Sequence, residues 1–379
     1  EGGTLSVNGV NKTITYIGGD GNDVALVPGN SPPTIISNGG GTTGTQSVPE
    51  NTTAVTTVIA VDAETPALQT LTYSISGGAD RLKFSIVPAT GVLSFASAPN
   101  FELPTDVGAN NVYEVTVQVA DDGLGTLIDT QALSVTVTDA NDSPTIARTN
   151  ATVTINEGSL IGNTGTFGDE DGNATAILSA SVGTVTPNNG AGTWSWAYTP
   201  ADGPTDSQTV TITANDGVNA AVTTTFALTV DNVAPVYDLG SPITLASNVD
   251  TLSTNISFVD PGADTWTGTV DYGDGTGTSA LSVNGGAKTF ALSHVYAVSG
   301  TYTVSVTLSD DDGGTLSDTV SVTVRLLPTV ITVAADPVRA LKATLKGTVN
   351  ARGLTTTPTF ELGTTSGVYT QTIAAVPAT

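Results

Sequence analysis

The stretch LSVTVTDANDSP (residues 133–144) joins a β-strand to a short acidic segment. Apolar and hydroxyl side chains alternate up to Thr138, which predicts a strand with one buried face. Asp139, Asn141 and Asp142 follow at once, and the stretch ends in a proline. It contains no Lys or Arg, so the two carboxylates repel each other unless a cation lies between them. Because Ca²⁺ prefers carboxylate and amide oxygens, the stretch predicts a calcium-binding joint between two β modules.

The length and composition of the chain agree with a series of such modules. Its 379 residues are too many for one sandwich and suit three to four modules of about 100 residues. The hydrophobic fraction of 39% follows an alternating pattern, which indicates a folded all-β protein rather than a disordered one. Gly123, Gly217 and Gly313 end similar strands at nearly equal intervals. We therefore expect tandem immunoglobulin-like (Ig-like) β-sandwiches arranged as an elongated rod.

The charge and the missing residue types exclude several functions. Lys and Arg number 10 against 35 Asp and Glu, a formal net charge of -25. This charge argues against nucleic acid and anionic membrane surfaces as partners and favours bound cations. The chain has no Cys, which excludes zinc–thiolate sites, iron–sulfur clusters, cysteine nucleophiles and disulfides. No apolar run reaches the ~18 residues of a transmembrane helix, so we expect no direct membrane insertion.

Residues 30–143 resemble a cadherin repeat. Six segments stand in the order of that family, namely Val48–Asn51, Val61–Glu64, Phe84–Leu93, Asn100–Leu103, Tyr113–Gly123 and Asp139–Asp142. In cadherins, acids of one repeat, of the linker and of the next repeat bind Ca²⁺ together. The resemblance implies Ca²⁺ ligands at Glu50, Glu102, Asp139, Asn141 and Asp142, completed by Asp169, Asp171 and Asp216 of the following module. One position departs from the family, since Asn100 stands where an acid is usual.

The rest of the chain resembles other sandwich families. Residues 144–233 are similar to a bacterial Ig-like domain. Residues 234–326 resemble a polycystic-kidney-disease (PKD) domain on the motifs Phe258–Gly262, Val270–Gly275 and His294–Val306. Residues 327–379 resemble the first half of a fibronectin-III-like module, and residues 1–29 look like the last strands of an incomplete module. The incomplete ends leave two interpretations open, a segment of a longer protein or ends that complete each other between chains by strand addition.

Acids near the other two joints form a second set of candidate metal ligands. Those joints carry fewer linker acids than residues 139–142, so solvated polar loops are the alternative there. The second set consists of Asp62, Glu64, Asp121, Asp122, Glu157 and Asp231.

The aromatic residues and the single histidine bear on ligand binding and catalysis. Trp194 and Trp196 alternate with Tyr198 and therefore share one strand face. They could stack on sugar rings as a ligand-binding strip or form the core of their sandwich, and both interpretations stay open. His294 is the only histidine and has no Ser or Cys partner motif, so we expect no enzymatic activity.

These features together predict a non-catalytic protein that is extracellular or on the cell surface. We expect a structural or adhesive stalk of Ca²⁺-stiffened Ig-like domains, part of a bacterial surface protein or fibre. The alternatives are a subunit of a head-to-tail filament joined by strand complementation, and carbohydrate- or protein-binding accessory modules of a large secreted protein. The expected partners are neighbouring modules or copies of the chain, with a cell-surface protein or glycan as a further candidate.

Overall fold

A computed structural model describes residues 3–7, 10–15, 25–63, 69–339, 342–365 and 368–376. Within these residues the regular structure is almost entirely β, and the one helix is a 3₁₀ turn, η1 (Arg81–Lys83). The predicted all-β fold of tandem sandwiches is confirmed. Across the described ranges, no helix has the length and apolar character that a bilayer crossing needs.

The chain divides into two compact units, and each is described by itself. The first comprises Glu1–Thr145 together with two later loops, Gly168–Ala176 and Asn215–Ala221. The second comprises Ile146–Phe167, Ile177–Ala214 and Val222–Thr379. The two later loops belong in sequence to the second sandwich. The first unit therefore contains all eight Ca²⁺ ligands that the cadherin resemblance implies.

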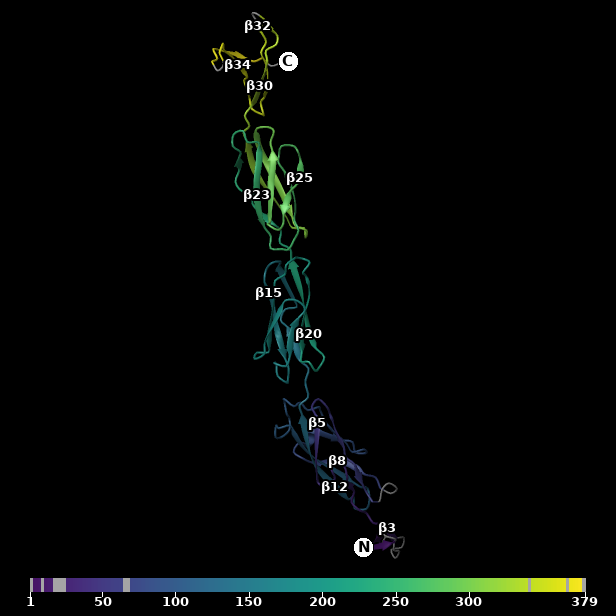
Figure 1. The fold of residues 1–379 in the computed structure, drawn as a ribbon. Helices are drawn as coiled ribbons and strands as arrows, with labels where there is room; N and C mark the ends of the chain where they lie inside the picture. Colours follow the sequence, from purple (N-terminus) through teal and green to yellow (C-terminus); the bar gives the residue numbers. More distant parts are fainter. Residues whose placement is uncertain are drawn as a thin grey trace. The chain divides into compact units, whose positions relative to one another are not determined.

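The first sandwich lies in the first unit and is drawn in purple to blue in Figure 1. One sheet has the strand order β5-β12-β11-β8 and the other has the order β6-β10-β9, while β4 pairs with β7. Buried valines of β11 and β12 alternate with half-buried or exposed neighbours, as the sequence pattern predicts. The strands are β4 (Thr34–Ile35), β5 (Thr43–Pro49), β6 (Ala54–Thr57), β7 (Ala60–Val61), β8 (Thr72–Gly77), β9 (Phe84–Ile86), β10 (Val92–Phe95), β11 (Val112–Ala120) and β12 (Ile128–Thr138).

The second and third sandwiches repeat this plan. The second consists of sheets β13-β15-β18-β17 and β14-β20-β19-β16, and the third of sheets β21-β23-β27-β26 and β22-β29-β28-β24-β25. The second has strands β13 (Thr145–Arg148), β14 (Thr152–Asn156), β15 (Ile161–Gly168), β16 (Ile177–Ala180), β17 (Thr184–Asn188), β18 (Thr193–Tyr198), β19 (Gln208–Asn215) and β20 (Val222–Asp231). The third has β21 (Val236–Tyr237), β22 (Ile243–Thr244), β23 (Thr251–Val259), β24 (Thr267–Asp271), β25 (Thr278–Ala280), β26 (Ser282–Asn284), β27 (Thr289–Val295), β28 (Gly300–Ser309) and β29 (Thr315–Val324).

Both ends of the chain form small sheets. At the N-terminal end the order is β1-β2-β3, and at the C-terminal end β30 pairs with β33, β31 with β32 and β34 with β35. The fibronectin-III-like resemblance of the C-terminal residues stays a prediction. The strands are β1 (Thr4–Val7), β2 (Val10–Thr15), β3 (Ala25–Pro28), β30 (Thr329–Val333), β31 (Val338–Arg339), β32 (Lys342–Ala343), β33 (Lys346–Asn350), β34 (Thr359–Leu362) and β35 (Gln371–Ala374).

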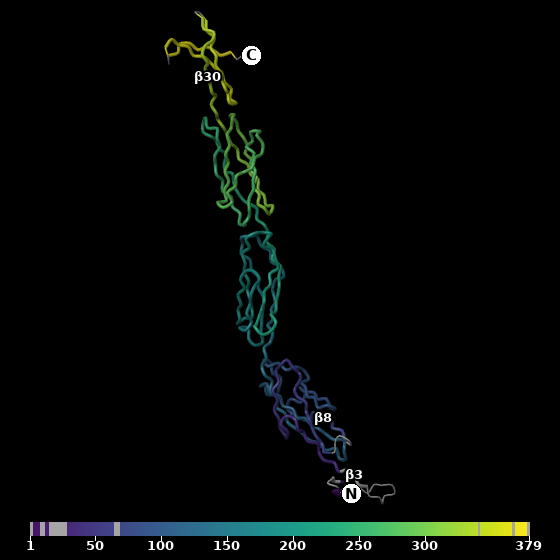
Figure 2. The backbone as a smooth tube through the Cα atoms, turned by 45° about the vertical axis from the view of Figure 1, so that its right-hand side comes forward, coloured from purple at the N-terminus to yellow at the C-terminus, as the bar shows by residue number. Residues whose placement is uncertain are grey.

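In each sandwich an early strand pairs in parallel with the last strand. The pairs are β5 with β12, β14 with β20 and β22 with β29. The last strand of each sandwich leads directly into the linker, and Figure 2 shows the backbone tube of each sandwich in its own range of colour. In the first sandwich the register places Pro49 opposite Thr138. The residue after Pro49 therefore lies beside the linker that follows Thr138.

The tryptophan pair belongs to the core of the second sandwich. Trp194 and Trp196 on β18 are 2% and 1% exposed. Their indole nitrogens donate to the carbonyls of Ala147 and Val182 at 3.1 and 2.7 Å. The prediction of a ligand-binding strip made of these two rings is therefore wrong, because the alternation of β18 turns them inward and Ser195 outward.

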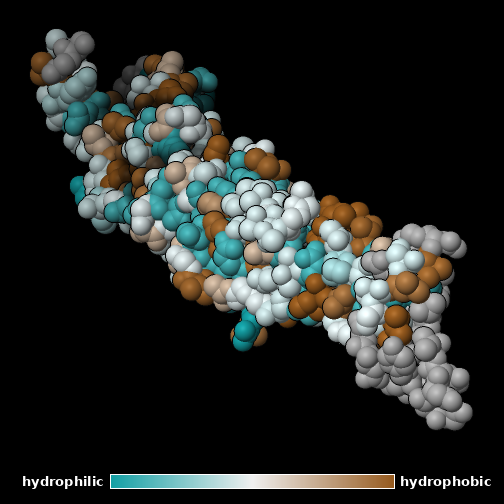
Figure 3. Space-filling model, turned by 90° about the horizontal axis from the view of Figure 1, so that it is seen from below, coloured by the Kyte–Doolittle hydropathy of each residue, from teal (hydrophilic) through white to brown (hydrophobic). Residues whose placement is uncertain are grey.

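On the face seen in Figure 3, hydrophobic residues are scattered among hydrophilic ones, as on an ordinary protein surface.

The single histidine has a structural partner in the third sandwich. Nε2 of His294 on β27 lies 2.8 Å from Oδ2 of Asp274. The imidazole stacks on Tyr272 with ring centroids 4.2 Å apart. Asp274 also accepts the hydroxyl of Thr276 at 2.6 Å. These contacts attach the turn after β24 (Thr267–Asp271) to β27, the strand that carries the histidine.

This turn is expected to lose its stabilising effect in acid. The hydroxyl of Thr276, and then the imidazole of His294, lower the pKa of Asp274 from 3.8 to about 2. A carboxyl whose pKa is depressed by folding stabilises the fold above its ordinary pKa, and the effect disappears as the pH falls from about 4 to about 2. Thermal melts of the wild type and of Asp274→Asn should therefore differ at pH 7 and converge near pH 2. A difference that stays constant over this range would contradict the assignment.

Candidate metal centre

Glu50 is held between the first sandwich and the linker that leaves it. Its backbone N–H donates to the carbonyl of Thr138 at 3.0 Å. One carboxylate oxygen accepts the N–H of Phe101 at 2.7 Å, and the other accepts the N–H of Ala140 at 3.0 Å. The next residue, Asn51, turns the chain at a φ of 60°, a left-handed conformation that asparagine tolerates. These bonds fix a carboxylate that is only 1% exposed beside the linker.

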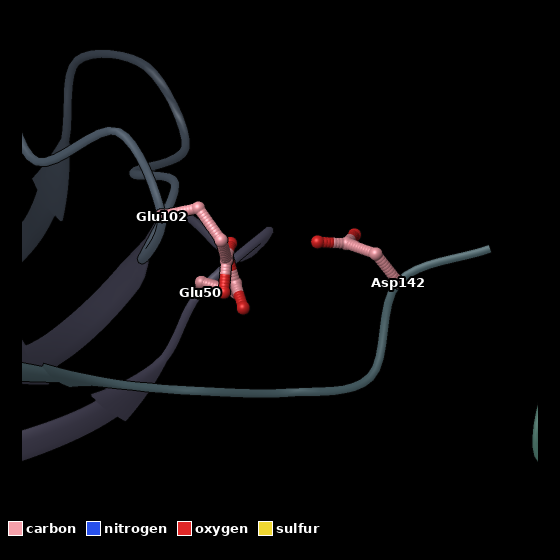
Figure 4. A group of neighbouring side chains, drawn as sticks. All are labelled: Glu50, Glu102 and Asp142. Atoms are coloured by element: carbon pink, nitrogen blue, oxygen red, sulfur yellow. The ribbon is translucent and has the colours of Figure 1, made fainter. Parts of the chain in front are cut away.

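Four further acids meet at this point. One oxygen each of Glu50, Glu102 and Asp142 lies within 4.8 Å of the others. In Figure 4, Glu50 and Glu102 lie close together, and the Asp142 carboxylate points toward them from the linker. Glu102, Asp139 and Asp171 form a second group, in which one oxygen of each residue also lies within 4.8 Å of the others. Because Glu102 belongs to both groups, the five residues make one assembly, which we call the first acidic cluster.

Several oxygens in and beside the first acidic cluster are buried without a hydrogen-bond partner. Among the described residues they include Oε2 of Glu102, Oδ2 of Asp142 and Oδ2 of Asp169. No Lys or Arg in the described ranges lies within 4.0 Å of these carboxylates. A buried carboxylate with neither a donor nor a base is costly. An all-oxygen donor set with unpartnered oxygens fits a hard cation such as Ca²⁺.

Burial and repulsion disturb the titration of the cluster. Burial, and then the charges of Glu50, Asp139 and Asp142, raise the pKa of Glu102. Burial and then the charge of Asp171 raise the pKa of Asp139. The pKa of Asp142 is also raised, by burial first and by neighbouring acids after that. A divalent cation among these groups would oppose the shifts, because an opposite charge favours the ionised form.

Two loops of the following module contact the linker. Asp171 accepts the backbone N–H of Asp142 at 2.7 Å. Asp216 accepts Nδ2 of Asn141 at 2.7 Å. The backbone N–H of Val218 donates to Asp216 as well, and this bond is the main cause that lowers the pKa of Asp216. The linker is thus bonded to these loops through both its main chain and its side chains.

The structure divides the eight predicted ligands into three kinds. Five of them are the carboxylates of the first acidic cluster. Asp169 lines the same groove as Asp142 and keeps one unpartnered oxygen. Asn141 and Asp216 bond each other, which makes them supports of the linker rather than members of the cluster.

Two contributors to the groove were missed by the sequence reasoning, Asn51 and Glu170. Nδ2 of Asn51 donates to Asp142 at 2.9 Å. Asn100 donates its amide to the carboxylate of Glu170. Asn100 is the residue that replaces the usual cadherin acid, and here it supplies a donor in place of a charge. The available signal for Glu170 was its position between the predicted ligands Asp169 and Asp171.

Two acids of the second set, Asp121 and Asp122, are occupied by local hydrogen bonds. Asp121 accepts two backbone N–H groups of its own loop and the side-chain amide of Asn30. Asp122 accepts the backbone N–H of Thr70 at 2.7 Å, and this bond lowers its pKa. Both carboxylates therefore close loops of the first sandwich, and a metal-binding role has no geometric support.

The remaining acids of the second set differ from one another. Within the described residues, neither Asp62 nor Asp231 belongs to a group of three acids that could share a cation. Glu64 lies outside the described residues. Glu157 is fully buried and does belong to such a group, with two acids of the PKD-like segment.

Comparison with protein families agrees with this organisation. Residues 45–156 match the cadherin domain family, residues 141–229 the bacterial Ig domain family and residues 232–324 the PKD domain family. The resemblances stated for these three segments are confirmed. Cadherin and bacterial Ig domains are typically extracellular, and cadherin domains typically bind Ca²⁺. All three families serve structural or adhesive roles rather than enzymatic ones, so the tandem points to a structural or adhesive protein.

Several solved structures are similar to the chain at low sequence identity. A protocadherin gammaB7 EC3-6 cis-dimer structure is 21% identical, covers 82% of this chain and 77% of its own, and has a TM-score of 0.35. Mouse cadherin-23 EC22-24 is 18% identical, with coverages of 79% and 99% and a TM-score of 0.36. The titin I-band fragment I67-I69 is 11% identical, with coverages of 79% and 99% and a TM-score of 0.31. No curated protein matches the chain. Such low values support no conclusion about function.

Proposed function

We propose that this chain is part of an extracellular bacterial stalk whose first joint, residues 139–144, is stiffened by Ca²⁺ in the first acidic cluster. The observation that carries the proposal is the pair of unpartnered oxygens on Glu102 and Asp142. They belong to carboxylates that approach each other and Glu50 within 4.8 Å. Charges this close need a cation unless a base is present.

The cluster collects its ligands from three parts of the chain. Glu50 and Glu102 come from the first sandwich, Asp139 and Asp142 from the linker, and Asp171 from a loop of the following module. A cation bound to all three parts would remove the repulsion between them. It would also restrict rotation about the linker, and the result would be a stiffer joint.

Modest affinity is sufficient for this role. Extracellular calcium modules have dissociation constants of roughly 10⁻⁴–10⁻³ M. Ca²⁺ at ten times the dissociation constant would add about 1.4 kcal/mol per site, and at a hundred times about 2.7 kcal/mol. Millimolar Ca²⁺ outside the cell would therefore produce a measurable gain in stability.

Calcium is expected to raise the first melting transition, and Asp142→Asn is expected to abolish most of this gain. The wild type in millimolar Ca²⁺ should melt about 5 °C higher than in excess chelator, since 1 kcal/mol shifts the Tm of a domain of this size by about 4–8 °C. Small-angle scattering of the same samples should give a smaller radius of gyration in chelator, because a joint without its cation can bend.

Asp122→Asn is the matched control, because it removes one charge from the same sandwich outside the cluster. It should respond to Ca²⁺ as the wild type does. The proposal is wrong if the wild type melts and scatters identically in Ca²⁺ and in chelator. It is equally wrong if Asp142→Asn keeps the full gain.

A further inference from the structure

The exit of the second sandwich repeats the arrangement around Glu50. The parallel pair β14–β20 places Asn156 opposite Asp231, and Glu157 follows directly. Its carboxylate oxygens accept the N–H of Val233 in the linker at 2.9 Å and the N–H of Gly203 at 2.8 Å. Glu157 thus holds the second linker in the way that Glu50 holds the first.

Acids from three loops gather next to Glu157. One oxygen each of Glu157, Asp260 and Asp264 lies within 4.8 Å of the others. Asp202, Asp264 and Asp312 form a further group, in which one oxygen of each residue also lies within 4.8 Å of the others. Asp264 belongs to both groups. We call these five residues the second acidic cluster, and all of them lie in the second unit.

Asp264 at the centre of this cluster lacks any partner of its own. Its side chain is 7% exposed, and within the described residues neither carboxylate oxygen has a hydrogen-bond partner. Oδ1 of Asp202 and Oδ1 of Asn232 are also buried without a partner. The other central acid, Asp260, is satisfied on one side by the indole N–H of Trp266 at 2.8 Å. Of Asp202 and Asn232, Asp202 belongs to the same acid group as Asp264.

The ammonium group of Lys288 lies beside the cluster but bonds main-chain oxygens. It donates to the backbone carbonyls of Asp260 and Gly262. In the described part of the chain no Lys or Arg forms an ion pair within 4.0 Å of the cluster.

We infer that the second acidic cluster is a binding site for a hard divalent cation such as Ca²⁺, with Asp264 as the shared ligand. Its oxygen-only donors exclude a preference for soft metals. Glu157 and Asp202 come from the second sandwich, whereas Asp260, Asp264 and Asp312 come from the third. A bound cation would therefore link these two modules through their side chains. The site is independent of the first acidic cluster and can exist without it.

Trp266 provides a specific reporter for this site. Terbium(III) takes the oxygen ligands of Ca²⁺ sites and emits when a nearby indole is excited. The indole of Trp266 bonds directly to Asp260, whereas the other two tryptophans are buried in the second sandwich. Excitation of the full-length chain with terbium(III) should give sensitised emission that added Ca²⁺ displaces. The emission should be lost in Trp266→Phe.

Asp264→Asn should weaken terbium(III) binding by at least about tenfold, as loss of a ligand contact does. Asp312→Asn should also weaken it, and because Asp312 is exposed this change poses little risk to folding. Asp311→Asn is the matched control, since Asp311 lies in neither acid group and accepts the backbone N–H of Thr265 at 2.9 Å. It should bind as the wild type does.

Three results would overturn the inference. The wild type could give no sensitised emission that Ca²⁺ displaces, which would leave the cluster as a set of partly protonated acids. Emission could persist in Trp266→Phe and Asp264→Asn alike, which would place the ion elsewhere. Finally, Asp264→Asn and Asp312→Asn could both bind as tightly as the control. The variants all lie outside the first acidic cluster, so these results test this joint separately from the first one.

Discussion

Replacing Trp196 with alanine is expected to lower the free energy of unfolding of the second sandwich by about 3–5 kcal/mol. The indole is 1% exposed and packs edge-on against Phe226 with ring centroids 4.9 Å apart. Its removal leaves a large cavity and deprives the carbonyl of Val182 of its donor. Urea unfolding followed by circular dichroism should show an early transition for one module while the other transitions keep their midpoints.

Ile177→Ala is the control for this experiment. Ile177 lies in the same sandwich but is 72% exposed, so its truncation should change stability by less than about 0.5 kcal/mol. If Trp196→Ala unfolds at the same urea concentration as the wild type, the ring does not form the core. The interpretation of the tryptophans as a ligand-binding strip would then return.

Replacing Glu50 with alanine is expected to destabilise the first sandwich by about 3 kcal/mol or more, even in chelator. The carboxylate accepts two backbone N–H groups, from Phe101 and Ala140. Hydrogen bonds to a charged group contribute about 1.5–3 kcal/mol each, and alanine leaves both donors unpaired. Thermal melts in chelator isolate this effect, because no cation then contributes. The loss should also appear as faster hydrogen exchange at the amide of Ala140.

Glu102→Gln is the informative contrast to Glu50→Ala. Oε2 of Glu102 has no partner among the described residues, and neighbouring acids raise the pKa of this group. Removing its charge should therefore leave stability in chelator unchanged or slightly improved, while the gain from Ca²⁺ disappears. If Glu102→Gln is as destabilising in chelator as Glu50→Ala, the two acids do not have the separate roles described above.

The β architecture could be predicted from the sequence because its signal is local. Alternation in residues 133–138 determines which side chains share a face, and the strand β12 follows it. Alternation does not determine whether that face is covered. For this reason the same pattern in Trp194 and Trp196 left two interpretations open until the opposite sheet was in place.

The two acidic clusters differed in how far the sequence could predict them. In the first, two ligands, Asp139 and Asp142, lie in the linker itself, and a family motif implied the others. In the second, the acid nearest to the linker in sequence is Asp231, the last residue of β20, and it lies outside the cluster. Asp202 and Asp264 are far apart in the chain and approach each other only after two sandwiches have folded. No local pattern could have paired them, although Glu157, Asp260 and the run Asp310–Asp312 could each be noted as acids near this joint.

The parallel pairing of early and last strands has a mechanical consequence. When a chain is pulled from its ends, this early strand and the last strand of the same sandwich are drawn in opposite directions along their common axis. The force then acts in shear, and all their hydrogen bonds bear the load together instead of opening one by one. The register pairs seven residues of β5 with β12, five of β14 with β20 and two of β22 with β29. Resistance to tension is thus unequal, and the third sandwich has the shortest clamp.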